Sequence, residues 1–165
     1  MRIVLFILTV LALVSCTDSG ITQASHLDFD ITITPEAETA FVQTNLNLAT
    51  RALVLLLDNA KKFTCPPEAA GGAAAVKERG KVVLGVSCTS DPEPLLTFTV
   101  EDSGIGIPPE EAEHIFEEFV QLDEYYDGTG IGLTVARSLA RRLGGDIVLD
   151  TSYSGGARFV YTLPL

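Results

Sequence analysis

Residues 101–119 read EDSGIGIPPEEAEHIFEEF. An acid, Asp102, stands just ahead of two glycines spaced by one residue, Gly104 and Gly106, and Ile-Pro-Pro follows them. A surface turn uses Asp-Ser-Gly for chain reversal alone. In a ligand site the aspartate would be a fixed acceptor, and each missing Cβ would let the backbone approach a flat or phosphorylated group. The rest of the chain decides between these two interpretations.

The composition indicates one globular domain that does not bind nucleic acid. Of the 165 residues, 47% are hydrophobic and 20% are charged, which suits a single core. The formal net charge is −11, whereas a protein that binds a phosphate backbone needs a basic face. Residues 101–127 contain ten acids and no Lys or Arg. A polyphosphate bound there would therefore need a metal ion or basic residues from elsewhere.

Residues 1–26 are predicted to be an apolar segment and a linker, separate from a domain at residues 27–165. Residues 1–16, MRIVLFILTVLALVSC, resemble a bacterial secretory signal whose last residue, Cys16, would take a lipid. The apolar run is short for a membrane-spanning helix. The alternative is an apolar helix or strand from a chain cut or started inside a longer gene. Cys65 and Cys88 lack zinc-site spacing and are predicted to be unpaired thiols in a reducing compartment.

The hydrophobic periodicity predicts an α/β (α+β) fold, a two-layer sandwich in which helices pack on one face of a mixed sheet. Thr44 or Asn45 can cap the first long helix, and Gly144 can end the last one. The predicted strands are residues 27–34, 81–88, 95–101, 146–150 and 157–163, and the predicted helices are residues 45–63, 109–119 and 131–143.

Two further segments carry residues suited to phosphate chemistry. In LLLDNAKKFT, residues 55–64, Asn59 and Lys62 are three apart and share a helix face, so an amide oxygen and an ammonium could hold Mg²⁺ and a phosphate. In DGTGIGLTVARSLARRLGG, residues 127–145, three glycines lead into a helix N-terminus that can seat phosphate. The glycine spacing is neither the dinucleotide fingerprint nor a P-loop. Taken alone, an asparagine near a helix end is more often a cap than a ligand, and the glycine cluster fits a turn as well as it fits a site.

The ordered combination resembles the ATP-binding domain of sensor histidine kinases, which belong to the GHKL superfamily with the Bergerat fold. The combination is a helix asparagine, Asp-x-Gly-x-Gly, paired phenylalanines, and Gly-x-Gly-x-Gly before a helix. The resemblance covers residues 27–165 and includes SYSGGARFVYTLPL at residues 152–165, which is similar to the family's closing hairpin.

The resemblance implies an ATP site. It assigns Asn59 as the Mg²⁺ ligand and, together with Lys62, as a catalytic residue, while Asp102 would accept a hydrogen bond from the adenine amino group. Phe116 and Phe119 correspond to the F box beneath a lid at residues 120–127. The implied ATP contacts are Asn59, Lys62, Phe63, Asp102, Gly104, Gly106, Ile107, Phe116, Phe119, Gly128, Thr129, Gly130, Gly132 and Leu133.

Several positions depart from the family pattern. Leu55 stands where many relatives have a polar residue near the attacking water, which argues against strong ATP hydrolysis. Neither the F box nor the lid carries a basic residue. His26 and His114 do not match the phosphoacceptor motif, so the implied acceptor is a histidine-bearing dimerisation domain in another chain or in a longer parent protein, followed by a response regulator.

These features predict a cytoplasmic domain, because ATP is scarce outside the cytoplasm. Tethering to the inner face of the membrane through residues 1–16 stays open. Two other functions also stay open: a nucleotide-dependent interaction module without kinase activity, and a serine kinase of the anti-sigma type.

Overall fold

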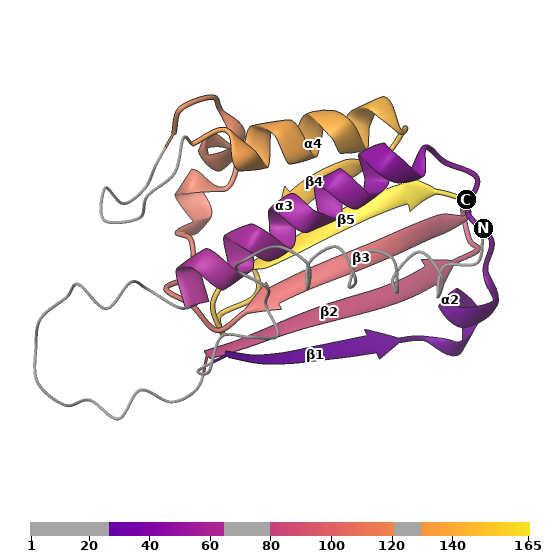
Figure 1. Ribbon diagram of the computed structural model, residues 1–165, viewed down its shortest axis with the longest axis horizontal. Helices are drawn as coiled ribbons and strands as arrows, with labels where there is room; N and C mark the ends of the chain where they lie inside the picture. Colours follow the sequence, from indigo (N-terminus) through magenta and orange to yellow (C-terminus); the bar gives the residue numbers. More distant parts are fainter. Residues whose placement is uncertain (1–26, 65–79, 121–129) are drawn as a thin grey trace, which may run out of the picture.

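The computed structural model describes residues 27–64, 80–120 and 130–165, and five strands within them form one mixed sheet (Figure 1). The strand order is β1-β2-β3-β5-β4. β1 and β2 run parallel, and the other neighbouring pairs are antiparallel. The strands are β1 Leu27–Ile33, β2 Gly80–Thr89, β3 Leu95–Asp102, β4 Asp146–Leu149 and β5 Arg158–Pro164. Each lies within a few residues of its predicted range.

The two long helices cover one face of this sheet. α3, Leu46–Thr64, and α4, Gly132–Arg142, lie side by side over the strands in Figure 1. Asn45 caps α3, since its Oδ1 accepts the N–H of Leu48 at 3.3 Å. The predicted two-layer α/β sandwich is therefore confirmed.

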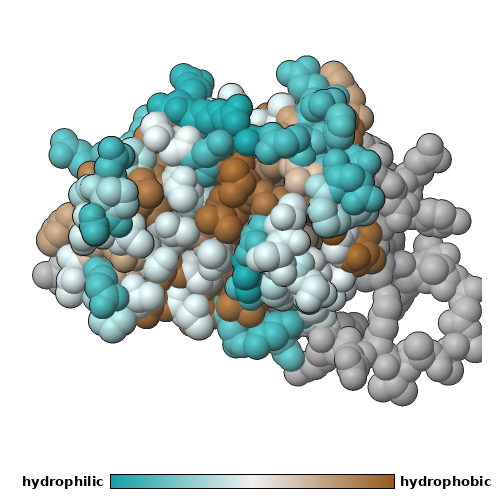
Figure 2. Space-filling model, turned by 180° about the vertical axis from the view of Figure 1, so that it is seen from behind, coloured by the Kyte–Doolittle hydropathy of each residue, from teal (hydrophilic) through white to brown (hydrophobic). Residues whose placement is uncertain are grey.

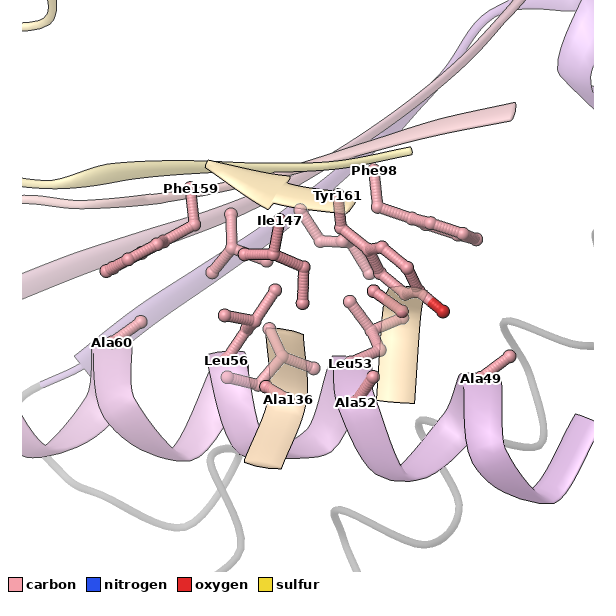
Figure 3. Packing of buried hydrophobic residues seen from close by; sticks show 14 of the residues in the cluster. Ala49, Ala52, Leu53, Leu56, Ala60, Phe98, Ala136, Ile147, Phe159 and Tyr161 are labelled. Atoms are coloured by element: carbon pink, nitrogen blue, oxygen red, sulfur yellow. The ribbon is translucent and has the colours of Figure 1, made fainter. Parts of the chain in front are cut away.

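The core fills the space between α3, α4 and the sheet. Alternate residues of the central strands are buried, such as Leu96, Phe98 and Val100 of β3, so one face of the sheet meets the helices. Figure 3 shows Leu53 and Leu56 of α3 packed toward Ile147, Phe159 and Tyr161. Each buried leucine contributes roughly 1.5–3 kcal/mol through apolar burial.

The opposite face of the sheet carries shorter and more polar side chains. Thr97, Thr99 and Thr162 alternate there with the buried residues of β3 and β5 and are half-buried. Figure 2, which views the molecule from behind, shows a surface that is mostly hydrophilic or intermediate, with small hydrophobic patches. Within the described ranges, the long helices leave this face of the sheet uncovered.

The predicted helix at residues 109–119 is wrong. The chain instead forms two short 3₁₀ turns, η2 Pro109–Glu111 and η3 His114–Phe116, and Glu117 then adopts an extended conformation. An α-helix would have kept Phe116 and Phe119 on one face. The extended residue separates them, so that Phe116 is buried and Phe119 is 71% exposed with a φ of 65°.

A short helix, α2 Pro35–Thr39, was not predicted. Thr34 caps it, with Oγ1 accepting the Ala37 N–H at 3.4 Å, and Pro35 occupies the first turn. Threonine before proline is a helix-start signal that the sequence does contain.

The predicted apolar segment at residues 1–16 lies outside the described ranges. Within those ranges, no helix has both the length and the apolar character needed to cross a membrane. Cys88 has a free thiol, as predicted.

Candidate functional site

Asp102 is a buried carboxylate held in place by backbone amides. It is the last residue of β3 and is only 2% exposed. Its Oδ1 accepts the N–H of Gly104 at 2.9 Å and the N–H of Ala157 at 3.2 Å, while its own N–H donates to the Ala157 carbonyl at 2.9 Å. Burial raises the pKa of the Asp102 carboxyl, and the two amide hydrogen bonds oppose that increase. The carboxyl group therefore has one fixed orientation.

The glycines around Asp102 are required by close backbone packing. A Cβ on Gly104 would lie 2.5 Å from the Phe63 carbonyl oxygen and 2.9 Å from Asp102 Oδ1. Gly156 has a φ of +146°, and a Cβ there would overlap the Asp102 carbonyl oxygen. Gly106, with a φ of +76°, packs against Gly156. The loop after β3 is thus wedged between the end of α3 and the hairpin between β4 and β5.

The last turns of α3 carry the predicted magnesium and phosphate residues. Asn59 and Lys62 lie one helical turn apart and are both half-buried. The Lys62 ammonium lies 5.1 Å from the centre of the Phe63 ring. Because the Phe63 carbonyl touches Gly104, this end of α3 adjoins the loop after β3. The structure therefore places these residues at the same end of the sheet as Asp102.

Among the described residues, no side chain caps the N-terminus of α4. Ile131 occupies the cap position and makes no side-chain hydrogen bond to the helix. Gly132, the first helical residue, is exposed, and a Cβ on it would meet no atom within 4 Å. Gly130, with a φ of +66°, packs against the backbone of Phe119 and Val120. An uncapped helix start carries unpaired N–H groups and the positive end of the helix dipole, which together attract anions.

A buried arginine, which was not predicted, connects α4 to its neighbours. Arg137 Nη1 lies 2.8 Å from Glu113 Oε2, and its Nε lies 3.0 Å from Asp146 Oδ1. Its guanidinium stacks 4.4 Å from the Phe116 ring centre, and Arg141 also binds Asp146 at 3.0 Å. Burial tends to raise the pKa of Asp146, but hydrogen bonds from the two arginines prevail and lower it to about 2. The sequence does contain a sign that Arg137 is buried, because this arginine lies between Ala136 and Leu139 on the apolar side of the helix.

The paired phenylalanines have different environments. Phe116 is in the core, with its ring edge-to-face with Phe159 at 6.3 Å between centres. Phe119 points outward beside Gly130. Ile107 and Leu133 are half-buried against the core. Among these four predicted ATP contacts, Phe119 alone has a largely exposed side chain.

The structure brings some of the predicted residues together and adds others. Phe63, Asp102 and Gly104 are in contact, as described above. Gly156 and Ala157 also touch Asp102 and were predicted only as part of a hairpin. Gly128 and Thr129 lie outside the described ranges.

The fold and these motifs together define a known class of protein. Residues 44–165 match the family described as histidine kinase-, DNA gyrase B-, and HSP90-like ATPase, so the chain belongs to this family. The GHKL relationship predicted from the motifs is confirmed.

Sensor proteins are among the relatives that the chain matches. The chain is 51% identical over 73 residues to sensor protein RstB of Escherichia coli (strain K12), a match that covers 42% of this chain and 17% of RstB. It is 29% identical over 147 residues to the sensor histidine kinase WalK of Bacillus subtilis (strain 168), covering 87% of this chain and 22% of WalK. The chain therefore spans about a fifth of the length of these sensors.

Solved structures share the fold. The mycobacterial sensor histidine kinase MprB matches with a TM-score of 0.74 and 24% identity, over 99% of this chain and 95% of the MprB chain. Full-length ShkA in complex with AMPPNP matches with a TM-score of 0.70 and 24% identity, over 96% of this chain and 30% of ShkA.

Proposed function

We propose that this chain is the ATP-binding catalytic domain of a two-component sensor histidine kinase, which transfers the γ-phosphoryl group of ATP to a histidine on a separate dimerisation domain. The observation that carries the proposal is the buried Asp102 carboxylate, fixed by two backbone amides at the end of β3. Family membership and the sensor kinases among its relatives support it.

Asp102 recognises the base in this proposal. Both amide hydrogen bonds fall on Oδ1, so neither of them occupies Oδ2. Oδ2 accepts a hydrogen bond from the exocyclic amino group of adenine and disfavours the carbonyl that guanine has at that position. A hydrogen bond to a charged acceptor of this kind contributes roughly 1.5–3 kcal/mol.

The triphosphate lies between the end of α3 and the start of α4. The N–H groups of Gly132 and the residues after it bind phosphate oxygens at the start of α4, and the missing side chain of the exposed Gly132 allows a close approach. Lys62 supplies positive charge, and the exposed Phe119 lies beside Gly130, just before α4. Ile107 and Leu133 support the walls from the core side. Gly104 and Gly106 allow the close backbone packing that holds Asp102 in place.

Mg²⁺ fits this site with Asn59 as its protein ligand. Among the described residues, no three His, Cys, Asp or Glu side chains gather to enclose a metal ion. Mg²⁺ usually keeps several waters and takes phosphate oxygens, so one amide oxygen is a sufficient protein contribution. When bound, the ion would neutralise charge on the β- and γ-phosphates.

The reaction breaks the bond between γ-phosphorus and the oxygen that bridges to the β-phosphate, and ADP leaves with that oxygen. A nitrogen of the acceptor histidine forms the new bond to phosphorus. Leu55 has no polar atom with which to orient a water, which favours transfer to the histidine over hydrolysis. The domain works in the cytoplasm, where ATP is available, and a response regulator then receives the phosphoryl group.

Isothermal titration with MgATP tests the base-recognition step. Asp102→Asn should weaken ATP binding by about 10- to 150-fold, because it replaces a charged acceptor with a donor or a neutral acceptor. The amide oxygen can still accept from Gly104 and Ala157, and the buried charge is gone, so the melting temperature should be unchanged or higher. Equal ATP affinity in the two proteins would remove the central support for the proposal.

A phosphotransfer assay tests the chemistry. Labelled γ-phosphate from ATP should appear on a separately purified dimerisation domain and should be lost in acid, as phosphohistidine is. Acid-stable label on a protein partner would instead show a serine kinase, and binding without any transfer would show an interaction module. Asn59→Ala removes the amide oxygen proposed to hold Mg²⁺ and should abolish transfer while the chain remains folded.

A further inference from the structure

Arg158 occupies a position directly behind the base-recognition residue. It is the first residue of β5, follows Ala157 in the sequence, and pairs with Glu101 in the register between β3 and β5. Glu101 directly precedes Asp102. Because side chains alternate along a strand, Arg158 and Glu101 project to the face of the sheet opposite Asp102 and the helices.

Arg158 joins two acids that belong to different elements. Its Nε lies 2.9 Å from Glu101 Oε1. The two groups form an ion pair, but the Nε–H does not make a hydrogen bond to this oxygen. Its Nη1 donates to Asp150 Oδ2 at 3.0 Å. The three side chains are 25–29% exposed, so solvent screens the pairs less than it would on an open surface.

The hairpin loop closes around the same guanidinium. Asp150 accepts the Ser152 N–H at 3.0 Å and its hydroxyl at 2.6 Å, and the Asp150 N–H donates to the Arg158 carbonyl at 2.8 Å. The Arg158 guanidinium carbon lies 4.2 Å from the centre of the Tyr153 ring. One side chain therefore holds the residue before Asp102, the start of the loop, and a ring within the loop.

We propose that Arg158 is a positioning residue for nucleotide specificity: the arginine fixes Gly156 and Ala157 against Asp102 and thereby sets the carboxylate to accept the exocyclic amine of adenine. This inference rests on the proposed function. Ala157 supplies one of the two amides that orient Asp102, and Gly156 packs on the Asp102 backbone. Arg158 itself contacts no nucleotide, because its side chain is on the other face of the sheet.

The test compares two nucleotides that differ at the group in question. Inosine triphosphate carries a carbonyl where ATP carries the amino group, but its ribose and phosphates are the same. Dissociation constants for both, with Mg²⁺, are measured by titration for the wild type and for Arg158→Met, which keeps a long apolar stem. ATP binding should weaken by about 3- to 10-fold in Arg158→Met, while inosine triphosphate binding stays within about twofold, because only the amine contact is misplaced.

Further variants make the result specific. Arg158→Lys should recover part of the ATP preference, since one ammonium can pair with either acid but cannot match both. Arg158→Met placed in Asp102→Asn should cause no additional loss of ATP affinity. Arg142→Met, an exposed arginine of α4 outside this network, should leave both constants unchanged. Should Arg158→Met fold poorly, Glu101→Gln removes the Nε ion pair with little change in shape and should lower the ATP preference in the same direction.

The outcomes separate the two claims. A wild type that binds ATP and inosine triphosphate equally contradicts base recognition by Asp102. A wild type that prefers ATP, with Arg158→Met unchanged or weakened equally for both nucleotides, supports Asp102 but overturns the role of Arg158. Equal weakening would reduce Arg158 to a contributor to hairpin stability.

Discussion

The two glycine-containing segments near the proposed nucleotide are held in place by different forces. The loop at residues 102–106 is wedged backbone against backbone, with the Phe63 carbonyl on one side and Gly156 on the other. The start of α4 is open at Gly132 and is positioned farther along the helix by the charged side chains of Arg137, Arg141 and Asp146. The first arrangement depends on shape and the second on charge.

The difference assigns each segment a physical task. Backbone contacts in a close-packed region allow little adjustment, which suits the reading of a rigid, flat base. Ion pairs that reach solvent respond to salt and pH, so the position of α4 can shift at a low energetic cost. Variants that fill space should damage the first segment most, and variants that remove charge should damage the second.

The largest effect is expected from Gly104→Ala. The new methyl group would meet a backbone carbonyl at 2.5 Å, which no side-chain rotation can relieve, so the free energy of unfolding should fall by about 2–3 kcal/mol. Urea denaturation monitors this change. An unfolding midpoint equal to that of the wild type would show that the wedge is looser than described.

Arg137→Met should have an intermediate effect. It removes two ion pairs and the contact with Phe116, but Asp146 keeps Arg141 and Glu113 can reach water. Unfolding should therefore become easier by about 1–2 kcal/mol, less than for a fully buried pair. Thermal melting at low and high salt measures this loss of stability. The difference in melting temperature between wild type and variant should become smaller as the salt concentration rises. Arg142→Met on the same helix is the control.

Lowering the pH should change the free energy of unfolding in opposite directions through Asp146 and Asp102. Asp146 has a folded pKa of about 2, below its ordinary value of 3.8, so its stabilisation is present above about pH 4 and is lost as the pH falls toward 2. Its side chain is 36% exposed, so the expected loss is about 1 kcal/mol after solvent screening. Asp102, whose pKa is raised, changes the free energy of unfolding in the opposite direction as it becomes protonated.

Unfolding curves across this pH range, compared between wild type and Asp146→Asn, measure the Asp146 contribution. The slope attributed to Asp146 should disappear in the variant. An identical pH dependence in both proteins would refute the assignment.

The smallest effect on folding is expected from Gly132→Ala. Nothing lies within 4 Å of the new methyl group, and alanine favours helix, so stability should stay the same or rise by up to about 0.5–1 kcal/mol. MgATP affinity should nevertheless fall several-fold if phosphate approaches this position. Titration and melting of the same sample separate the two effects, and unchanged affinity would move the phosphate away from Gly132.

Local sequence patterns were sufficient to predict most of the elements of the fold. Alternation in β3 and the apolar face of α3 depend on near neighbours, so periodicity located both. The 109–119 segment was misassigned because the spacing of its apolar residues also fits a helix. The extended backbone at Glu117 follows from the burial of Phe116 against Phe159 and Arg137, which are distant in sequence.

The site was predictable to the extent that its residues form contiguous motifs. Asp102 and the glycines after it were identified directly, whereas the contribution of Gly156 and Ala157 requires knowledge that β5 lies beside β3. Arg137 and Arg158 escaped prediction for the same reason. Their roles come from partners on other elements, and a single sequence does not reveal which elements meet.

The placement of β5 between β3 and β4 has a consequence for how the chain folds during synthesis. The residue just before β5, Ala157, donates one of the two backbone hydrogen bonds that hold Asp102, which is synthesised 55 residues earlier. While a ribosome is still synthesising residues 157–164, the nascent polypeptide lacks the strand that connects β3 to β4. Competence to hold a nucleotide should therefore arise only after residues 157–164 have emerged, in one cooperative event.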